Sequence, residues 1–203
     1  MTDSETAVIF DLGNVILPFD PLVPCRVLGD RAGMKAVDAC QTIYRNNLER
    51  WFEQGKLDGD QFTAGVAAAL GIDLEIDSFR DLWADMFVED KAVAGIVRQL
   101  KPHHRLVLLS NTNPWHWHYA REKFPVLAEF DTVVLSYEEG VLKPHPAIYR
   151  AALEKAGTPD RAIFIDDIAI NVAGAQILGI SGLLFRSAAQ LRQDLTRLGC
   201  RLD

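Results

Sequence analysis

The chain opens with a short apolar run that ends at a polar turn. Residues 8–10, Val-Ile-Phe, have the composition of a buried strand, Asp11 follows at once, and Gly13 interrupts the apolar pattern before it resumes. This pattern predicts a first strand with one carboxylate at its carboxyl end. Taken alone, Asp11 has two interpretations of equal weight. It is placed for chemistry, because ligands of open parallel sheets lie beyond the strand ends, or it caps a turn.

A helical pattern follows the first strand. Between residues 22 and 88 the apolar positions recur every three or four residues, which is typical of amphipathic helices. A proline-rich segment, residues 17–21, delays the first helix because proline lacks a backbone donor and disfavours helix at the residue before it. Asp58 or Asp60 is placed to cap a helix within the stretch. The expected helices cover residues 37–48, 62–70 and 79–86.

Beyond residue 91 the pattern alternates between strand-like and helical segments. The strand-like runs are residues 105–109, 132–135, 162–165 and 182–185. The helical segments are residues 92–100, 115–123, 146–156, 170–178 and 188–198. This order predicts an α/β fold, a doubly wound, Rossmann-like parallel sheet with helices on both faces. Because no strand-like run falls between residues 18 and 104, we predict an inserted α-helical cap at 18–88 and a catalytic core at 1–17 and 89–203.

Composition and charge narrow the class of protein. With 203 residues, 49% of them hydrophobic, the chain is long enough for one sizeable core with an inserted lobe. The net charge of −7 argues against a nucleic-acid partner, because binding to phosphate backbones relies on clusters of Lys and Arg. A small phosphorylated metabolite is compatible with that charge, since it responds to the local field of its site.

The sequence carries no signal for export or for a membrane. Residues 1–6 are polar and acidic, and the apolar runs are shorter than the about 18 residues that a spanning helix needs. Cys25, Cys40 and Cys200 are widely spaced and form no CxxC motif, so neither a disulfide framework nor a zinc site is expected. We therefore predict a cytoplasmic protein with reduced thiols. The sequence does not specify the oligomeric state.

Polar side chains of distinct types follow the first four predicted strands. In chain order they are Asp11, Ser110-Asn111-Thr112, Lys143-Pro144 and Asp166-Asp167. The carboxyl ends of parallel strands meet at one edge of a sheet, so we expect these groups in one crevice. Each also has a structural interpretation, because such residues cap helices or end solvated loops. Their occurrence together at the same edge favours a functional site.

This combination of groups is suited to phosphoryl transfer. Asp11, Asp166 and Asp167 would repel one another unless a cation lay among them, which predicts a hard divalent ion, Mg²⁺. Lys143 and Mg²⁺ would neutralise a phosphate dianion. The Ser110 hydroxyl and the next two backbone amides, which open a helix, would donate hydrogen bonds to phosphate oxygens. Asp11 would attack phosphorus and form an aspartyl-phosphate that water hydrolyses.

These motifs resemble the four ordered motifs of the haloacid dehalogenase superfamily. The residues that carry the likeness are Asp11-Leu12-Gly13-Asn14-Val15, Ser110-Asn111-Thr112-Asn113, Lys143-Pro144 and Asp166-Asp167 with Asn171. The likeness spans residues 7–185, and the helical insertion is similar to the α-helical cap of that superfamily. The motifs are most similar to those of the branch that contains α-D-glucose-1-phosphate phosphatase. The resemblance implies a Mg²⁺-dependent phosphatase of a small phosphorylated metabolite, with a sugar phosphate such as a hexose 1-phosphate as the preferred substrate.

The resemblance also implies a role for each motif residue. Asp11 is the expected nucleophile, and Asp11, the backbone carbonyl of Gly13 and Asp167 are the expected Mg²⁺ ligands. Asp166 is expected to hold metal-bound water, and Asn171 to orient Lys143 or the metal site. The residues expected to bind phosphate are Ser110, Asn111 and Lys143, of which Lys143 also steadies the nucleophile.

One position departs from the superfamily pattern. Phosphatases of the superfamily usually carry a second Asp two residues after the nucleophile, where it protonates the leaving oxygen, and this chain has Gly13 there. General acid–base help contributes about 10²–10⁴-fold, so its loss matters most for a poor leaving group. Two alternatives therefore stay open: a haloacid dehalogenase-type hydrolase of carbon–halogen bonds, and a non-catalytic binding module with the same fold.

Other residues have open roles. The segment Trp115–Tyr119 either forms a rim of the pocket, with His116 or His118 as a substitute acid, or is a helix whose Trp rings pack on the core while its His residues face water. In the cap, the residues that could reach a substrate are Tyr44, Arg45, Trp51 and Glu53.

Overall fold

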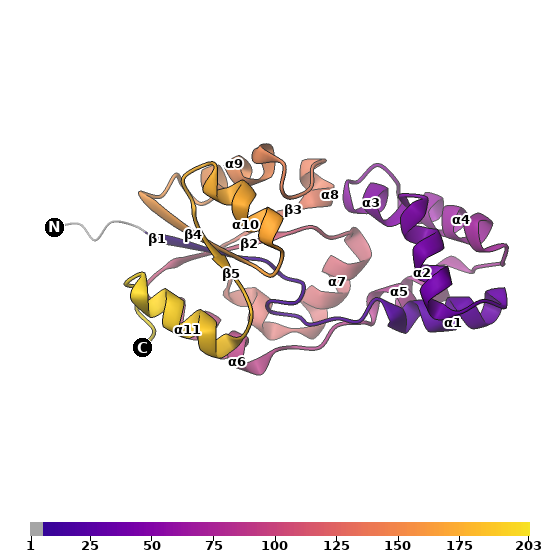
Figure 1. Ribbon diagram of the computed structural model, residues 1–203, viewed down its shortest axis with the longest axis horizontal. Helices are drawn as coiled ribbons and strands as arrows, with labels where there is room; N and C mark the ends of the chain where they lie inside the picture. Colours follow the sequence, from indigo (N-terminus) through magenta and orange to yellow (C-terminus); the bar gives the residue numbers. More distant parts are fainter. Residues whose placement is uncertain (1–5) are drawn as a thin grey trace.

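The core of the protein is a parallel β-sheet. The structure, a computed structural model, describes residues 6–203. Residues 1–5, which belong to the polar amino-terminal segment and to the predicted core, lie outside the described residues. The strands are β1 (Thr6–Phe10), β2 (Arg105–Ser110), β3 (Thr132–Leu135), β4 (Arg161–Asp166) and β5 (Ser181–Leu184). They pair in parallel in the order β3-β2-β1-β4-β5. The predicted α/β fold is confirmed (Figure 1).

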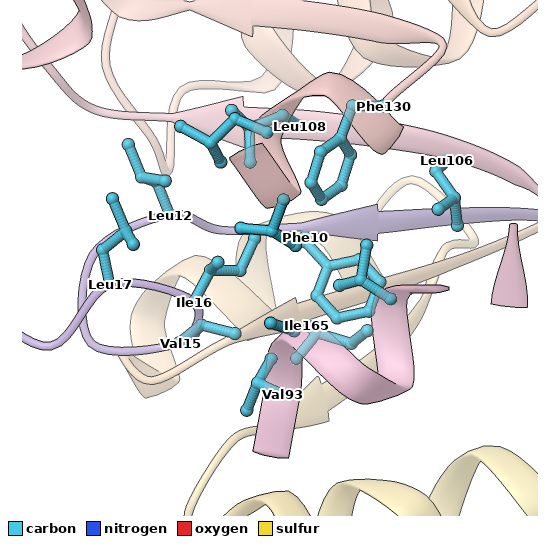
Figure 2. Close-up of a cluster of buried hydrophobic side chains, with 14 of the residues drawn as sticks. Phe10, Leu12, Val15, Ile16, Leu17, Val93, Leu106, Leu108, Phe130 and Ile165 are labelled. Atoms are coloured by element: carbon cyan, nitrogen blue, oxygen red, sulfur yellow. The ribbon is translucent and has the colours of Figure 1, made fainter. Parts of the chain in front are cut away.

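Helices cover both faces of this sheet. They are α6 (Lys91–Leu100), α7 (Pro114–Lys123), α9 (Pro146–Lys155), α10 (Ala169–Gln176) and α11 (Ala188–Arg197). Side chains alternate along each strand, so Phe10 and Ile165 pack towards α6, α7 and α11 (Figure 2). Ile9 and Phe164 pack on the opposite face with α9 and α10. Burial of both faces explains why the strands are continuous apolar runs in the sequence.

The stretch between β1 and α6 is helical. It contains α1 (Leu22–Ala32), α2 (Ala36–Arg45), α3 (Leu48–Glu53), α4 (Gly59–Leu70) and α5 (Ile76–Ala84). These helices have their own hydrophobic cluster, in which Phe52 and Phe62 stack and Trp83 meets Phe62 edge-on. Trp115 of α7 packs against this cluster from the core side. The insertion is thus helical as predicted, and its division from the core at residues 18 and 88 stays a prediction.

Two details of the insertion differ from or refine the sequence pattern. The helix expected over residues 37–48 is two helices, because Asn47 has a left-handed backbone (φ 55°) between the end of α2 and the start of α3. Of the two candidate caps, Asp58 caps α4: its side chain accepts a hydrogen bond from the Gln61 amide at 2.8 Å, and the Gln61 side chain accepts one from the Asp58 amide at 3.0 Å.

The two connections between core and insertion run side by side. Phe19 and Phe87 form an antiparallel bridge, and their ring centroids lie 5.6 Å apart. The Val88 amide donates to the Pro18 carbonyl at 2.9 Å. The helices therefore join the core through a short two-stranded contact rather than through two separate linkers (Figure 1).

The expectation of three reduced thiols is wrong for two of the cysteines. Cys25 of α1 and Cys40 of α2 form a disulfide with a sequence separation of 15, and Cys200 is a buried free thiol. The spacing of the cysteines in the sequence did not predict this disulfide, because the packing of α1 on α2 brings the two residues together. The thiol-based reason for a cytoplasmic location does not hold for this pair. Among residues 6–203, no helix combines the length and apolar composition needed to cross a membrane.

Candidate active site

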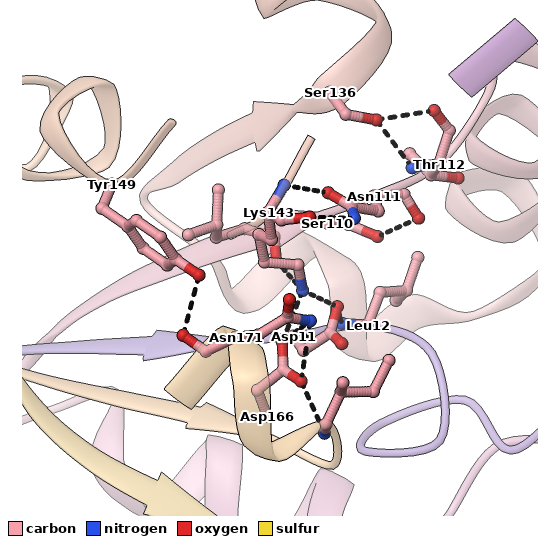
Figure 3. A network of polar contacts seen from close by, with 12 residues as sticks. Asp11, Leu12, Ser110, Asn111, Thr112, Ser136, Lys143, Tyr149, Asp166 and Asn171 are labelled. Carbon is pink, nitrogen blue, oxygen red and sulfur yellow. Dashed lines mark hydrogen bonds and ion pairs between the residues drawn. The ribbon is translucent and has the colours of Figure 1, made fainter. Parts of the chain in front are cut away.

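The predicted site residues meet at the carboxyl edge of the sheet. Asp11 directly follows β1, its amide donates to the Ile165 carbonyl of β4 at 2.9 Å, and its side chain is buried. Asp166 ends β4 and is fully buried. Lys143 lies in the segment that follows β3 and is also buried (Figure 3). This is the edge at which the strand order changes direction around β1, where open α/β sheets bind ligands.

Lys143 lies between two carboxylates. Its Nζ is 2.7 Å from Asp11 Oδ1 and 2.7 Å from Asp166 Oδ2, and it donates to the Leu109 carbonyl at 3.2 Å. All three donors of the ammonium group are therefore used. Burial alone would lower the pKa of Lys143, but the charges of Asp11 and Asp166 outweigh burial and raise it. The side chain is a fixed positive charge beside the predicted nucleophile.

Asp166 is held by several donors. Its Oδ1 accepts from the Ile168 amide at 2.8 Å, and the Asn171 Nδ2 lies 3.1 Å from each carboxylate oxygen. The Tyr149 hydroxyl donates to the Asn171 carbonyl at 2.8 Å and ties α9 to α10 beneath the site. Asn171 thus orients Asp166, which in turn fixes Lys143 (Figure 3). Tyr149 was not predicted, because an aromatic residue on a helix carries no signal that separates it from core packing.

The carboxylates form a site that fits a cation. Asp11, Asp166 and Asp167 each offer an oxygen, and these oxygens lie within 4.8 Å of one another. Burial, against the attraction of Lys143, raises the pKa of Asp11 to about 8, and burial together with Asp166 raises that of Asp167. If all three carboxylates were ionised beside Lys143, the site would carry two net negative charges, which a bound cation would offset. Oxygen donors of this kind suit a hard divalent cation, so the donor set fits the predicted Mg²⁺.

The segment after β2 is arranged differently from the prediction. The Asn111 side chain makes a reciprocal pair with the Lys143 backbone, accepting from its amide at 2.8 Å and donating to its carbonyl at 3.2 Å. The Thr112 amide donates to Ser136 Oγ at 2.9 Å. The Asn111 side chain therefore holds the Lys143 loop, and the Thr112 amide is already paired, whereas Ser110 lies at the cavity described next.

A small cavity of about 50 Å³ lies between the strand ends and the helical insertion. From the core it is lined by Leu12, Gly13, Ser110, Asn111, Thr112 and His116, and from the insertion and its connections by Phe19, Glu49, Glu53 and Phe87. The predicted phosphate-binding residues Ser110 and Asn111 thus share one cavity with two carboxylates of α3. Glu49 was not predicted, although it lies one helical turn before Glu53, which was named.

The position of the missing second Asp is closed. A Cβ atom on Gly13 would lie 2.9 Å from Cε1 of the Phe19 ring, which is closer than such atoms approach. The ring therefore occupies the space that a side chain at position 13 would need. The sequence does not predict this contact, because nothing distinguishes Phe19 from the other apolar residues of the proline-rich segment.

His116 cannot act as a substitute acid. It is buried at the cavity, so the alternative in which it faces water does not hold for His116. Its Nδ1 lies 3.0 Å from Asn113 Nδ2, and its Nε2 lies 3.1 Å from the Trp83 carbonyl. Because the amide donates and the carbonyl accepts, the ring is neutral with its proton on Nε2. Burial lowers the pKa of His116 to about 4. His118 on the same helix is exposed.

The remaining named residues of the insertion lie outward. Tyr44 and Trp51 are 44% and 41% exposed, and Arg45 donates to the Gln41 side chain at 3.0 Å. Of the four residues singled out there, Glu53 lines the cavity.

Ser136 was not predicted as a site residue, although it directly follows strand β3, as Asp11 directly follows β1. It joins Thr112 to the backbone of Glu53, its Oγ lying 2.6 Å from the Glu53 carbonyl.

Comparisons with known proteins agree with this geometry. D-Ribitol-5-phosphate phosphatase of Bacteroides thetaiotaomicron is 26% identical over 197 residues, which cover 93% of this chain and 96% of that protein. A sesquiterpene phosphatase of Aspergillus oryzae is 27% identical over 204 residues, covering 98% of this chain and 100% of that protein.

Solved structures give the same fold. A haloacid dehalogenase family enzyme of Bacteroides thetaiotaomicron, in complex with magnesium and inorganic phosphate, has a TM-score of 0.77 and 26% identity over 90% of this chain and 94% of that one. A hydrolase of the same type from Porphyromonas gingivalis has a TM-score of 0.82 at 24% identity, covering 97% and 98% of the two chains. The model of the family described as haloacid dehalogenase-like hydrolase matches residues 5–179, and the chain belongs to that family.

Proposed function

We propose that the protein is a Mg²⁺-dependent phosphatase that hydrolyses a small phosphorylated metabolite through an aspartyl-phosphate on Asp11. The observation that carries this proposal is the buried arrangement in which Lys143 bridges Asp11 and Asp166 beside Asp167. A module that only bound phosphate would not need a carboxylate and an ammonium group held together in this way. Displacement of a halide does not need a cation site, so the carboxylate cluster argues against that chemistry.

The roles of the residues follow from their positions. Asp11, the carbonyl of Gly13 and Asp167 would hold Mg²⁺, which supplies positive charge to the phosphate oxygens when bound. Asp11 attacks phosphorus with the oxygen that does not face Lys143, and the ester bond to the leaving oxygen breaks. Lys143 and the Ser110 hydroxyl stabilise the charge that develops on the phosphoryl group. Water then attacks the aspartyl-phosphate, releases phosphate and restores Asp11.

The residues that line the cavity favour a polar substrate of sugar or polyol type. On its helical side the cavity is lined by Glu49 and Glu53, whose carboxyl groups can accept hydrogen bonds from hydroxyl groups. One relative acts on ribitol 5-phosphate, whereas another acts on a sesquiterpene phosphate. We take a sugar phosphate, such as a hexose 1-phosphate, as the substrate class because carboxyl groups favour hydroxyls over an apolar chain.

Phosphate release tests the proposal. We expect the wild type to release phosphate from hexose 1-phosphates and from ribitol 5-phosphate with Mg²⁺, and to lose this activity in excess chelator. Asp11→Asn should reduce release to the uncatalysed rate because an amide is a poor nucleophile. The exposed Asp60→Asn, which removes the same charge from α4, is the control and should keep wild-type activity. A wild type that binds Mg²⁺ but releases no phosphate from any of these esters would contradict the proposal.

A further inference from the structure

The chain lacks a proton donor where its family usually has one. Gly13 has no side chain, and the Phe19 ring fills the adjoining space. Expulsion of an alkoxide from a sugar phosphate is slow unless the leaving oxygen is protonated. A catalyst of such esters with this sequence therefore needs another acid within reach of the cavity.

Among the cavity-lining residues, few side chains can supply a proton. His116 is neutral and both of its ring nitrogens are paired, so it is excluded. The remaining titratable groups on the cavity wall are Glu49 and Glu53, both on α3. Lys143 is committed to Asp11 and Asp166.

Of the two glutamates, Glu53 is fixed to the core. Its carbonyl lies 2.6 Å from Ser136 Oγ, and Ser136 accepts from the amide of Thr112, which adjoins the predicted phosphate-binding residues. The turn after α3 also approaches the core closely, because Gly55 packs against the backbone of Tyr137 in α8 (Ser136–Glu139). Helix α3 therefore meets α8 at the end of the sheet, as Figure 1 shows.

The charges around Glu53 suit a proton donor. Burial raises the pKa of Glu53 to about 7, against the attraction of Lys143 and Arg50, whereas the pKa of Glu49 is raised by burial and by Glu53. Glu53 lines the same cavity as the predicted phosphate-binding residues Ser110 and Asn111, and the charge of Lys143 acts on Glu53 but not on Glu49 among the causes of their pKa shifts. Tyr44 is a further group that interacts with both glutamates, since burial, Glu49 and Glu53 raise its pKa. A bound phosphate dianion would raise the pKa of Glu53 further and keep the acid protonated.

We propose that Glu53 is the general acid and base of the reaction, replacing from the helical insertion the Asp that the family carries at position 13. This inference rests on the proposed phosphatase function. In the first step Asp11 bonds to phosphorus, the ester oxygen leaves, and the Glu53 proton moves to it. In the second step water bonds to phosphorus, gives its proton to the Glu53 carboxylate, and the bond to Asp11 breaks. Glu53 is then protonated again.

Leaving groups of different basicity test this role. Glu53→Gln should lower kcat/KM by about 10²–10⁴-fold for an alkyl phosphate such as ribitol 5-phosphate. For 4-nitrophenyl phosphate, whose leaving group needs no proton, kcat/KM should change little. Because water loses its base in the second step, 4-nitrophenyl phosphate should give a burst of nitrophenolate followed by slow turnover. Wild-type kcat/KM for the alkyl ester should fall as pH rises through the pKa of Glu53, and this fall should vanish in the variant.

Glu49→Gln is the matched comparison, because it removes a carboxyl from the same cavity and helix. It should affect both esters by a similar factor. If Glu53→Gln also lowers both esters equally, or leaves the alkyl ester unchanged, Glu53 is not the acid. A second variant, Gly13→Asp with Phe19→Ala, makes room for the family's acid and should restore alkyl-ester activity in the Glu53→Gln background. Inactivity of the wild type on every ester would instead remove the proposed function itself.

Discussion

His116 is a buried imidazole whose neutral form is built into the fold. Its Nε2 donates to the Trp83 carbonyl, and its Nδ1 accepts from Asn113 Nδ2, so only the neutral ring satisfies both partners. Asn113 also caps α7 by accepting from the His116 amide at 3.0 Å. His116 therefore joins the start of α7 to the end of α5. Protonation of its Nδ1 would place a positive charge against the Asn113 amide donor.

This arrangement predicts a loss of stability in acid. The pKa of His116 is lowered from 6.5 to about 4, so between these values the unfolded chain binds a proton that the folded chain does not. The contribution is complete above pH 6.5 and is lost as pH falls towards 4, with a cost of roughly 2 kcal/mol between pH 7 and pH 5. Urea unfolding of the wild type and of His116→Gln at both pH values should show the smaller decline in the variant. Equal declines would contradict this assignment.

At the scale of single residues, the sequence predicts charged groups better than contacts. Asp11 and Lys143 could be found because each is a polar residue directly after an apolar run or in the loop that follows one. The same rule would also have found Ser136. The contact between Phe19 and Gly13, and the burial of His116, depend on which residues the fold brings together, and no local pattern encodes that.

At the scale of elements, the helical insertion depends on one covalent link and several hydrophobic contacts. The disulfide joins α1 to α2 across a separation of 15 residues, and both cysteines are buried. Closing a loop of that length in the unfolded chain is expected to stabilise the folded state by about 3 kcal/mol.

Reduction should therefore weaken the insertion. We expect reductant to lower the free energy of unfolding of the wild type by about 3 kcal/mol, and to leave Cys25→Ala/Cys40→Ala unchanged. Alkylation of the protein unfolded without reductant provides a direct count, since Cys200 alone should react. Modification of three thiols under those conditions would show that the bridge is absent in solution.

Helices and strands were predictable where the apolar residues follow one simple pattern along the sequence. The strands carry continuous apolar runs, because both faces of the sheet are covered, and their ends were placed within a residue or two. The expected helix over residues 37–48 was wrong because its apolar spacing continues through Asn47, whereas the backbone reverses there into a left-handed turn. The disulfide between α1 and α2 could not be predicted, because it follows from the packing of two helices whose relative position the sequence pattern does not state.

At the scale of the whole molecule, the site depends on how closely the insertion approaches the core. Ser136 ties Glu53 to the core, and two features keep the approach close: the paired connections at Phe19 and Phe87, and Gly55, whose backbone lies against Tyr137. A Cβ atom on Gly55 would overlap the Tyr137 carbonyl. The absence of a side chain at Gly55 is therefore a condition for the cavity to have its present shape.

Gly55→Ala should separate helix α3 from α8 and lower activity. Gly33→Ala is the matched control, because Gly33 has nearly the same backbone (φ 66° against 64°) but nothing within 4 Å of an added Cβ. Both variants should lose roughly 1 kcal/mol of stability from the left-handed backbone alone. Phosphate release from an alkyl ester should fall by at least about tenfold in Gly55→Ala, since a displacement of about 1 Å at a reacting group has an effect of this size or larger. Gly33→Ala should stay close to the wild type. Equal activity of the two variants would mean that catalysis does not require α3 to approach α8 as closely as the structure has it.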